Sequence, residues 1–139
     1  MSPGNSRAEL VDIATEWTSL WCTPVNWSRF DALHADSFED CSSAGRPCTK
    51  EGYAEGLADL VRVFPDLQTR VTDLVVDEIN SKVAVRWMAE GTNRQPFLGV
   101  GPTNQLTKFS GIEIIEIHHG KIVRRWGEWD ISAHLEACD

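Results

Sequence analysis

The sequence predicts an α+β fold, with helices in its first half and a curved antiparallel sheet in its second. Apolar residues before Pro65 recur at helical spacing, whereas those after it alternate as in strands covered on one face. A two-residue turn, His119-Gly120, joins the last two strand segments, and its glycine accommodates the positive φ of a tight hairpin. We expect residues 1–139 to form a single domain, because this length builds one substantial core.

Two long helices are expected, each with one apolar face. The face of the first, which ends before Pro24, consists of Leu10, Ile13, Ala14, Trp17, Leu20 and Trp21. Thr49 is the expected N-cap of the second, and Pro65 ends it. Its apolar stripe is Tyr53, Leu57, Leu60, Val61 and Phe64. A helical turn over 28–33 and a short strand over 37–42 lie between these helices.

Four strands follow, over residues 67–77, 82–91, 106–118 and 121–130. The turn between the first two is expected at Asn80-Ser81. The loop 92–105 carries Gly99 and Gly101, but no helix follows them, so we interpret it as a lid or turn and not as a phosphate loop. A helical piece over 132–137 is expected to complete the domain.

The acidic balance of the chain excludes some classes of partner. A net charge of −8 disfavours nucleic acid and anionic membranes, both of which require clustered Lys and Arg. No apolar segment reaches the length of a membrane span or resembles a signal peptide, so we expect a cytoplasmic protein.

The cysteines and histidines predict no metal site. The four cysteines are scattered, and we expect them to be reduced and mostly buried, although the spacing also permits a Cys41–Cys48 bridge. Consecutive strand residues point to opposite faces, so His118 and His119 cannot bind one metal together. His34 and His134 are expected at the surface or as gate residues.

The terminal hairpin predicts which side chains share a face of the sheet. With a two-residue loop, His118 pairs with Lys121. Each further pair lies one residue earlier on the first strand and one residue later on the second. One face is then Phe109, Gly111, Glu113, Ile115 and Ile117 with Ile122, Arg124, Trp126, Glu128 and Asp130. Acids and aromatic residues on an otherwise apolar face suit the wall of a cavity.

A plainer interpretation stays open, in which these acids are solvated or paired, with Arg124 neutralising Glu113 or Glu128. The opposite face carries Ile112, Ile114, Val123 and Trp129 beside Glu116 and Arg125, and it is apolar enough to predict a subunit interface. Trp17 and Trp21 fit the core, whereas Trp87, Trp126 and Trp129 fit either the pocket or the interface.

Several motifs give the chain a resemblance to a known family. They are Phe64-Pro65-Asp66, Gly91-Thr92-Asn93, the segment from Pro96 to Thr103, and Gly120-Lys121-Ile122-Val123 followed by Trp126 and Trp129-Asp130. On these residues the chain resembles the SnoaL-like polyketide cyclases of the nuclear-transport-factor-2/ketosteroid-isomerase-like superfamily. The resemblance covers nearly the whole chain and implies a cone-shaped α+β barrel around a pocket.

The resemblance also implies a chemistry: aldol-type ring closure of a polycyclic, anthracycline-type polyketide in antibiotic biosynthesis, without cofactor or metal. In the cyclases, an aspartate ten residues after the hairpin glycine is the acid/base, and here that residue is Asp130. We expect Glu113 to assist Asp130, and a homodimer or tetramer to form. The expected substrate-binding residues are Asn93, Trp126, Phe109, Glu128, Trp87 and Arg124.

This chain departs from the family pattern at two positions. Asn93 stands where the family often has histidine, and Glu113 stands where cyclases tend to carry histidine. A carboxylate in an apolar pocket is a stronger base than in water, and Asn93, Trp126 or a protonated Glu113 would donate hydrogen bonds to an enolate. Two alternatives stay open: hydroxylation, isomerisation, dehydration or epoxide opening on the same fold, and non-catalytic binding.

Overall fold

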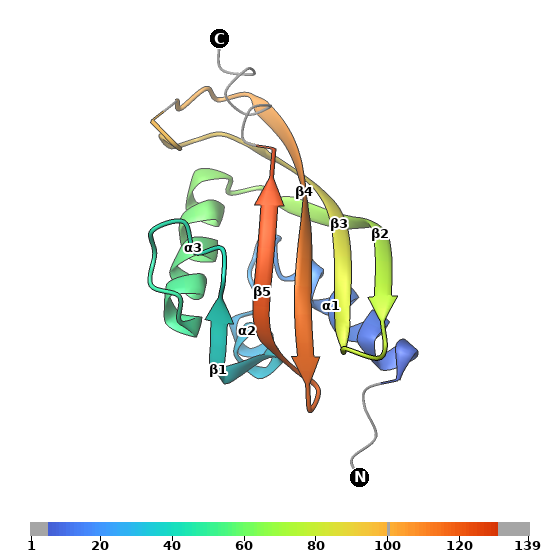
Figure 1. Cartoon of the computed structure of the whole chain (residues 1–139). Helices are drawn as coiled ribbons and strands as arrows, with labels where there is room; N and C mark the ends of the chain where they lie inside the picture. Colours follow the sequence, from blue (N-terminus) through green and yellow to red (C-terminus); the bar gives the residue numbers. More distant parts are fainter. Residues whose placement is uncertain (1–5, 100, 131–139) are drawn as a thin grey trace.

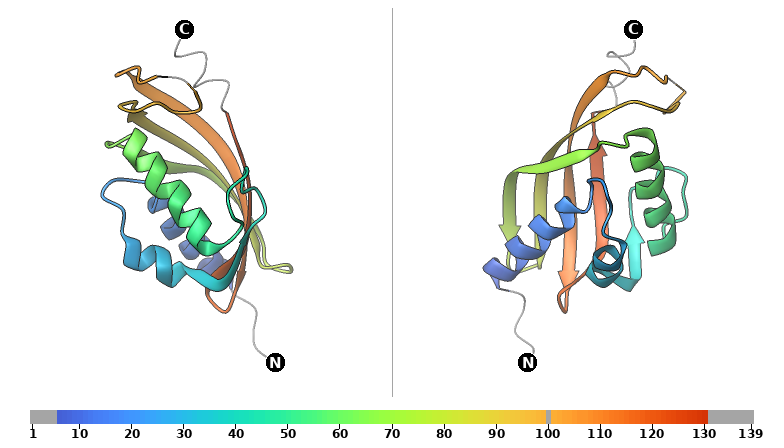
Figure 2. Two further views of the ribbon diagram at one scale, coloured as in Figure 1. Left: turned by 90° about the vertical axis from the view of Figure 1, so that its left-hand side faces the viewer. Right: turned by 180° about the vertical axis from the view of Figure 1, so that it is seen from behind.

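The computed structural model describes residues 6–99 and 101–130. Three helices, α1 (Arg7–Ser19), α2 (Trp27–Leu33) and α3 (Lys50–Val63), lie on one side of a curved sheet (Figures 1 and 2). The strands are β1 (His34–Asp40), β2 (Gln68–Asp77), β3 (Lys82–Thr92), β4 (Leu106–His118) and β5 (Lys121–Trp129). The predicted α+β fold is confirmed.

The sheet is mixed, not wholly antiparallel. Its order is β1-β5-β4-β3-β2, with β1 parallel to β5 and all other neighbours antiparallel. The strand expected at 37–42 begins three residues earlier, directly after α2. This parallel pairing brings the end of β1 beside the middle of β5, where Asp40 aligns with Arg125.

Local sequence signals explain where the helices begin. The side chains of Ser6, Asn26 and Thr49 each accept a hydrogen bond from a backbone N–H in the first turn of the helix that follows. The N-cap role predicted for Thr49 is therefore confirmed. Gly52 is required in the first turn of α3, because a Cβ there would collide with the carbonyl of Pro47.

The main core lies between the sheet and the helices. Leu10, Ala14 and Trp17 of α1 pack there, as the helical pattern predicts. Ile115, Ile117 and Ile122 of the terminal hairpin close it from the sheet. A smaller cluster around Phe64 and Phe109 lies toward the other end of the strands.

The predicted register of the terminal hairpin is wrong beyond its first two pairs. His118↔Lys121 and Ile117↔Ile122 hold, but a β-bulge at Val123 shifts every later pair by one residue. Glu113 therefore lies opposite Gly127 and not Trp126, and Gly111 lies opposite Trp129 and not Glu128. Because side chains alternate between faces, the slip exchanges the two faces of β5.

Two expectations about burial are also wrong. His34 is fully buried, not at the surface: its Nε2 accepts from Trp17 Nε1 at 3.0 Å, and its Nδ1 lies 2.7 Å from the carbonyl oxygen of Phe30. Cys41 and Cys48 are exposed and Cys22 is half-buried, and these three thiols are free. His134, Cys138 and the helix expected at 132–137 lie outside the described residues.

Candidate active site

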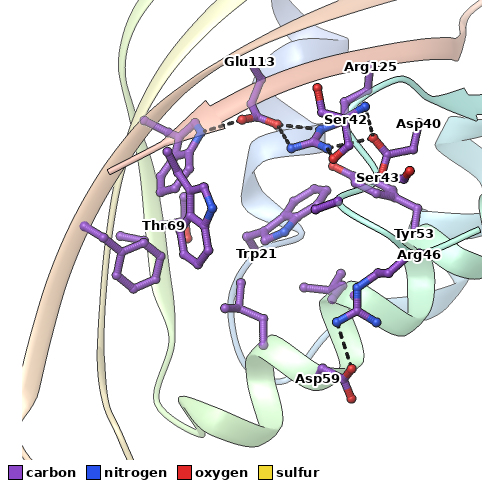
Figure 3. Close-up of a pocket in the computed structure, with 18 of the residues that line it drawn as sticks. Trp21, Asp40, Ser42, Ser43, Arg46, Tyr53, Asp59, Thr69, Glu113 and Arg125 are labelled. Atoms are coloured by element: carbon purple, nitrogen blue, oxygen red, sulfur yellow. Dashed lines mark hydrogen bonds and ion pairs between the residues drawn. The ribbon is translucent and has the colours of Figure 1, made fainter. Parts of the chain in front are cut away.

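A cavity of about 330 Å³ lies between the inner face of the sheet and helices α1 and α3. Aromatic side chains from both layers contribute to its wall, and Figure 3 shows a polar group on one side of it. The aromatic residues are Trp17, Trp21, Tyr53, Trp87, Phe97, Phe109 and Trp129. A cavity of this size and character suits a small, flat, hydrophobic molecule.

The polar side of the cavity is a carboxylate–arginine cluster formed by Asp40, Glu113 and Arg125 (Figure 3). Arg125 donates from Nε to Glu113 Oε1 at 2.8 Å, and its Nη2 forms an ion pair with the same oxygen at 2.7 Å. From Nη1 it donates to Asp40 Oδ1 at 2.8 Å and to the carbonyl oxygen of Ser42 at 3.2 Å. The guanidinium is thereby fixed between two buried carboxylates.

The backbone of β5 makes room for this cluster. The bulge turns Arg125 toward the cavity, opposite Ile115, while Arg124 points to the outer face. The next inward position is Gly127, where a Cβ would collide with both carboxylate oxygens of Glu113 and with Arg125 Nη2. On β4, Gly111 leaves space for the indole of Trp87, because a Cβ there would lie 2.5 Å from its Cζ2.

Burial and the ion pair act in opposite directions on Glu113. Its residue exposure is 5%, and burial raises the pKa of the carboxyl despite the charge and hydrogen bonds of Arg125. Burial disfavours the charge of Arg125, but its ion pairs with Glu113 and Asp40 outweigh that cost and raise its pKa. The cluster therefore holds a carboxylate that is more basic than one in water.

One oxygen of Glu113 is held only loosely. Oε1 accepts a hydrogen bond from Arg125 Nε and forms an ion pair with Nη2, whereas Oε2 accepts one bond, from Trp87 Nε1 at 3.3 Å. A carboxylate oxygen has two lone-pair directions, so Oε2 retains capacity for a proton.

Tyr53 adds a hydrogen-bond donor to the same wall. Burial raises the pKa of its phenol well above the ordinary value, so the hydroxyl stays protonated. Its ring lies under Arg125, with Cζ 5.2 Å from the ring centroid. Within residues 6–99 and 101–130, no protein group accepts from or donates to this hydroxyl, so it is available to a ligand.

The structure brings three of the predicted site residues into the cavity wall. They are Glu113, Phe109 and Trp87. Trp126, Arg124 and Glu128 instead lie on the outer face, because of the bulge at Val123. There Trp126 stacks under Lys82 Nζ, and Arg124 pairs with Glu116. Trp129, expected on the outer face, lines the cavity.

Asn93 is buried but does not line the cavity. Its side chain is fully enclosed next to Gly101 in the loop after β3. Neither amide atom has a hydrogen-bond partner in the described structure. A direct contact between Asn93 and a molecule in the cavity would require this loop to move.

Asp130 lies one residue beyond β5 and is exposed. Its backbone N–H donates to the carbonyl oxygen of Ser110 at 2.8 Å, which continues the shifted register. That register aligns Asp130 with Ser110, on the side of Glu128 and Ile112, and it is not part of the cavity wall. The predicted pairing of Asp130 with Phe109 is therefore wrong.

Several cavity residues were missed by sequence reasoning, among them Arg125, Asp40, Tyr53 and Ser42. One signal for Asp40 existed, because it alternates with the apolar Phe38 in a short strand and therefore shares its inward face. Tyr53 was assigned correctly to the inner stripe of α3, but its hydroxyl was not considered.

The described residues contain no cluster of His, Cys, Asp or Glu arranged to hold a metal ion. None of the described helices combines the length and the apolar character that crossing a membrane requires.

A family model, described as SnoaL-like polyketide cyclase, matches residues 11–137. The chain belongs to the SnoaL-like polyketide cyclase family. The resemblance stated from the motifs is thereby confirmed. A search of curated proteins returned no match.

Solved structures share the fold of this family member at low sequence identity. TsrD from Streptomyces laurentii superimposes with a TM-score of 0.84 at 18% identity, covering 95% of this chain and 96% of TsrD. AclR from Streptomyces galilaeus, proposed to be a hydroxylase, superimposes with a TM-score of 0.83 at 22% identity, and the match covers 96% of this chain and 86% of AclR. A SnoaL-like polyketide cyclase from Agrobacterium tumefaciens superimposes with a TM-score of 0.74 at 24% identity, and the match covers 94% of this chain and 98% of the cyclase.

Proposed function

We propose that this protein is a cofactor-independent acid/base enzyme that closes a ring in a polycyclic polyketide by an aldol reaction. The observation that carries the proposal is the buried Glu113, placed by Arg125 at the polar side of an aromatic cavity. Family membership supports a polyketide substrate, and the flat aromatic walls suit a fused ring system.

The proposed reaction needs only groups of the chain and the substrate. Glu113 Oε2 removes a proton from a carbon between two carbonyls, and the electron pair of that C–H bond forms an enolate. The enolate carbon attacks a second carbonyl of the same molecule and forms the new C–C bond. The resulting alkoxide takes the proton back from Glu113, so atoms and charge balance without a redox partner.

Tyr53 is the proposed donor to the developing oxyanion. Its hydroxyl stays protonated and has no protein acceptor in the described structure, and it lines the same cavity as Glu113. A donor already aimed at the site lowers the energy of the enolate without reorganising at the moment of reaction.

Asp130 competes with Glu113 for the acid/base role, since the family resemblance assigns that role to Asp130. The two carboxylates are separated by replacing each with its amide and assaying a polycyclic polyketide methyl ester for cyclised product. We expect Glu113→Gln to lower kcat by at least 100-fold while ligand quenching of tryptophan fluorescence persists, and Asp130→Asn to retain most activity. The reverse result would assign the chemistry to Asp130.

A second candidate function is the hydrolytic opening of an epoxide. It is favoured by the arginine held between two carboxylates, a set that can activate a water and protonate the epoxide oxygen. Both carboxylates would then be required. The test adds Asp40→Asn to the two amide variants and uses an aryl epoxide as a second substrate. This candidate is favoured if the unaltered protein hydrolyses the epoxide but does not turn over the methyl ester, and if Asp40→Asn loses the epoxide activity.

A further inference from the structure

We propose that Arg46, at the mouth of the cavity, binds a carboxylate of the substrate, so that the preferred ligand is an aromatic polyketide acid and not its ester. This inference rests on the proposed function for the identity of the ring system. It assigns a specificity-determining role to a residue outside the carboxylate–arginine cluster.

Arg46 is a cation of the cavity wall with donors to spare. It lines the cavity, and its side chain is 40% exposed. In the described structure it donates one side-chain hydrogen bond, from Nη2 to Asp59 Oδ2 at 3.0 Å. A guanidinium carries five N–H donors, so most of those on Arg46 have no acceptor in the described protein. Arg125, in contrast, is fully engaged with Glu113, Asp40 and Ser42.

Arg46 can turn to a ligand without leaving a charge unpaired. Its partner Asp59 has a second cation nearby, because Arg62 Nη2 lies 3.7 Å from Asp59 Oδ1. Arg62 is not part of the cavity wall. If Arg46 turned toward a bound anion, Asp59 would keep Arg62, so the cost of breaking the pair is small.

The helix beneath Arg46 leaves it room. Gly56 of α3 has no side chain, and Arg46 Nε lies 3.4 Å from where a Cβ would be. Figure 3 shows the guanidinium of Arg46 directed away from the carboxylate–arginine cluster and toward Asp59. The cavity therefore has two polar regions, the carboxylate–arginine cluster and the group around Arg46.

The two polar regions have opposite charge balance. Two carboxylates and one guanidinium leave the carboxylate–arginine cluster net negative, whereas Arg46, Arg62 and Asp59 leave the mouth net positive. An anionic substituent is repelled by the first region and attracted by the second. A ring system with a carboxylate would thus enter with that group at the mouth and its reacting carbons near Glu113.

The test measures binding alone, by tryptophan quenching, with anthraquinone-2-carboxylate and its methyl ester as probes. For the unaltered protein we expect the acid to bind roughly tenfold more tightly than the ester at low salt, and the preference to shrink as salt rises. Arg46→Gln should remove this preference and leave ester binding within about twofold. Arg62→Gln keeps Arg46 but removes the second partner of Asp59, so it should reduce the preference for the acid less than Arg46→Gln does.

An equal acid-to-ester ratio in the unaltered protein and in Arg46→Gln would overturn the inference, as would a preference for the ester. The result is distinguishable from failure of the proposed function. Glu113→Gln, inactive under that proposal, should still prefer the acid. If the unaltered protein prefers the acid but turns over no polyketide substrate, only the ring-closure chemistry is refuted.

Discussion

At the scale of single residues, the site depends on glycines as much as on charged side chains. Glu113 and Arg125 meet across the position of Gly127, and Trp87 occupies the space above Gly111. Glycine in a strand interior weakens the strand, and it often marks a place where another group must approach closely. Both glycines therefore serve the cavity at some cost to the sheet.

Gly127→Ala should separate Glu113 from Arg125, because the new methyl group would occupy the place of the carboxylate. We expect a loss of roughly 3 kcal/mol in the free energy of unfolding, typical of breaking a buried ion pair, together with loss of activity. Urea denaturation measures the first effect. Glu55→Ala, at an exposed position of α3, is the control and should change stability by less than about 0.5 kcal/mol. Equal effects of the two substitutions would contradict this account of Gly127.

At the scale of elements, the register of β5 shows what the sequence predicts and what it hides. The helices, the strands and the terminal turn of the described residues follow from apolar spacing and caps, and they were predicted close to their observed bounds. The bulge at Val123 was not, because Arg124 and Arg125 are adjacent and identical, so a one-residue slip leaves an arginine facing Glu113 in either register. The packing of the whole sheet decides between the predicted and the observed register of β5, whereas the spacing of residues along the hairpin does not.

His34 joins α1, α2 and β1, and its titration should be visible in stability. Burial lowers the pKa of His34 to about 4, so the folded protein keeps it neutral where the unfolded chain, with a pKa near 6.5, becomes protonated. Its contribution to stability is therefore complete above pH 6.5 and is lost as pH falls toward 4. Burial raises the pKa of Glu113, so that carboxyl acts in the opposite direction and does not explain a loss on acidification.

Between pH 7 and pH 5, we expect His34 to lower the free energy of unfolding by about 2 kcal/mol. Urea denaturation at both pH values checks this. The control is His34→Gln, which lacks the titrating group. The quantity compared is the change in the free energy of unfolding between the two pH values, and not the absolute stability of the variant. A variant whose stability falls as steeply as that of the unaltered protein would show that other groups cause the acid loss.

At the scale of the whole molecule, the outer face of the sheet predicts how two copies associate. Ile112 and Ile114 are exposed in the middle of it, at 54% and 40%. Ile112 lies between Arg86 on β3 and Glu128 on β5. A twofold axis through this apolar centre would bring Arg86 of one copy to Glu128 of the other, and we propose a homodimer of this kind.

Sedimentation equilibrium should detect this dimer and its charge pairing. Arg86→Glu would place two acids together across the interface and should weaken association by at least tenfold. The double variant Arg86→Glu with Glu128→Arg restores opposite charges and should recover it. Unchanged association in Arg86→Glu would exclude this interface, and a monomeric unaltered protein would exclude the homodimer.

The central claim is that Glu113, in the cavity wall, removes a proton from carbon. It is tested most directly by deuterium exchange in D2O, with a cyclic 1,3-diketone that cannot close a ring, followed by NMR. The unaltered protein and Asp130→Asn should accelerate exchange at the carbon between the carbonyls, and Glu113→Gln should not. Exchange that survives in Glu113→Gln, or disappears in Asp130→Asn, would contradict the account.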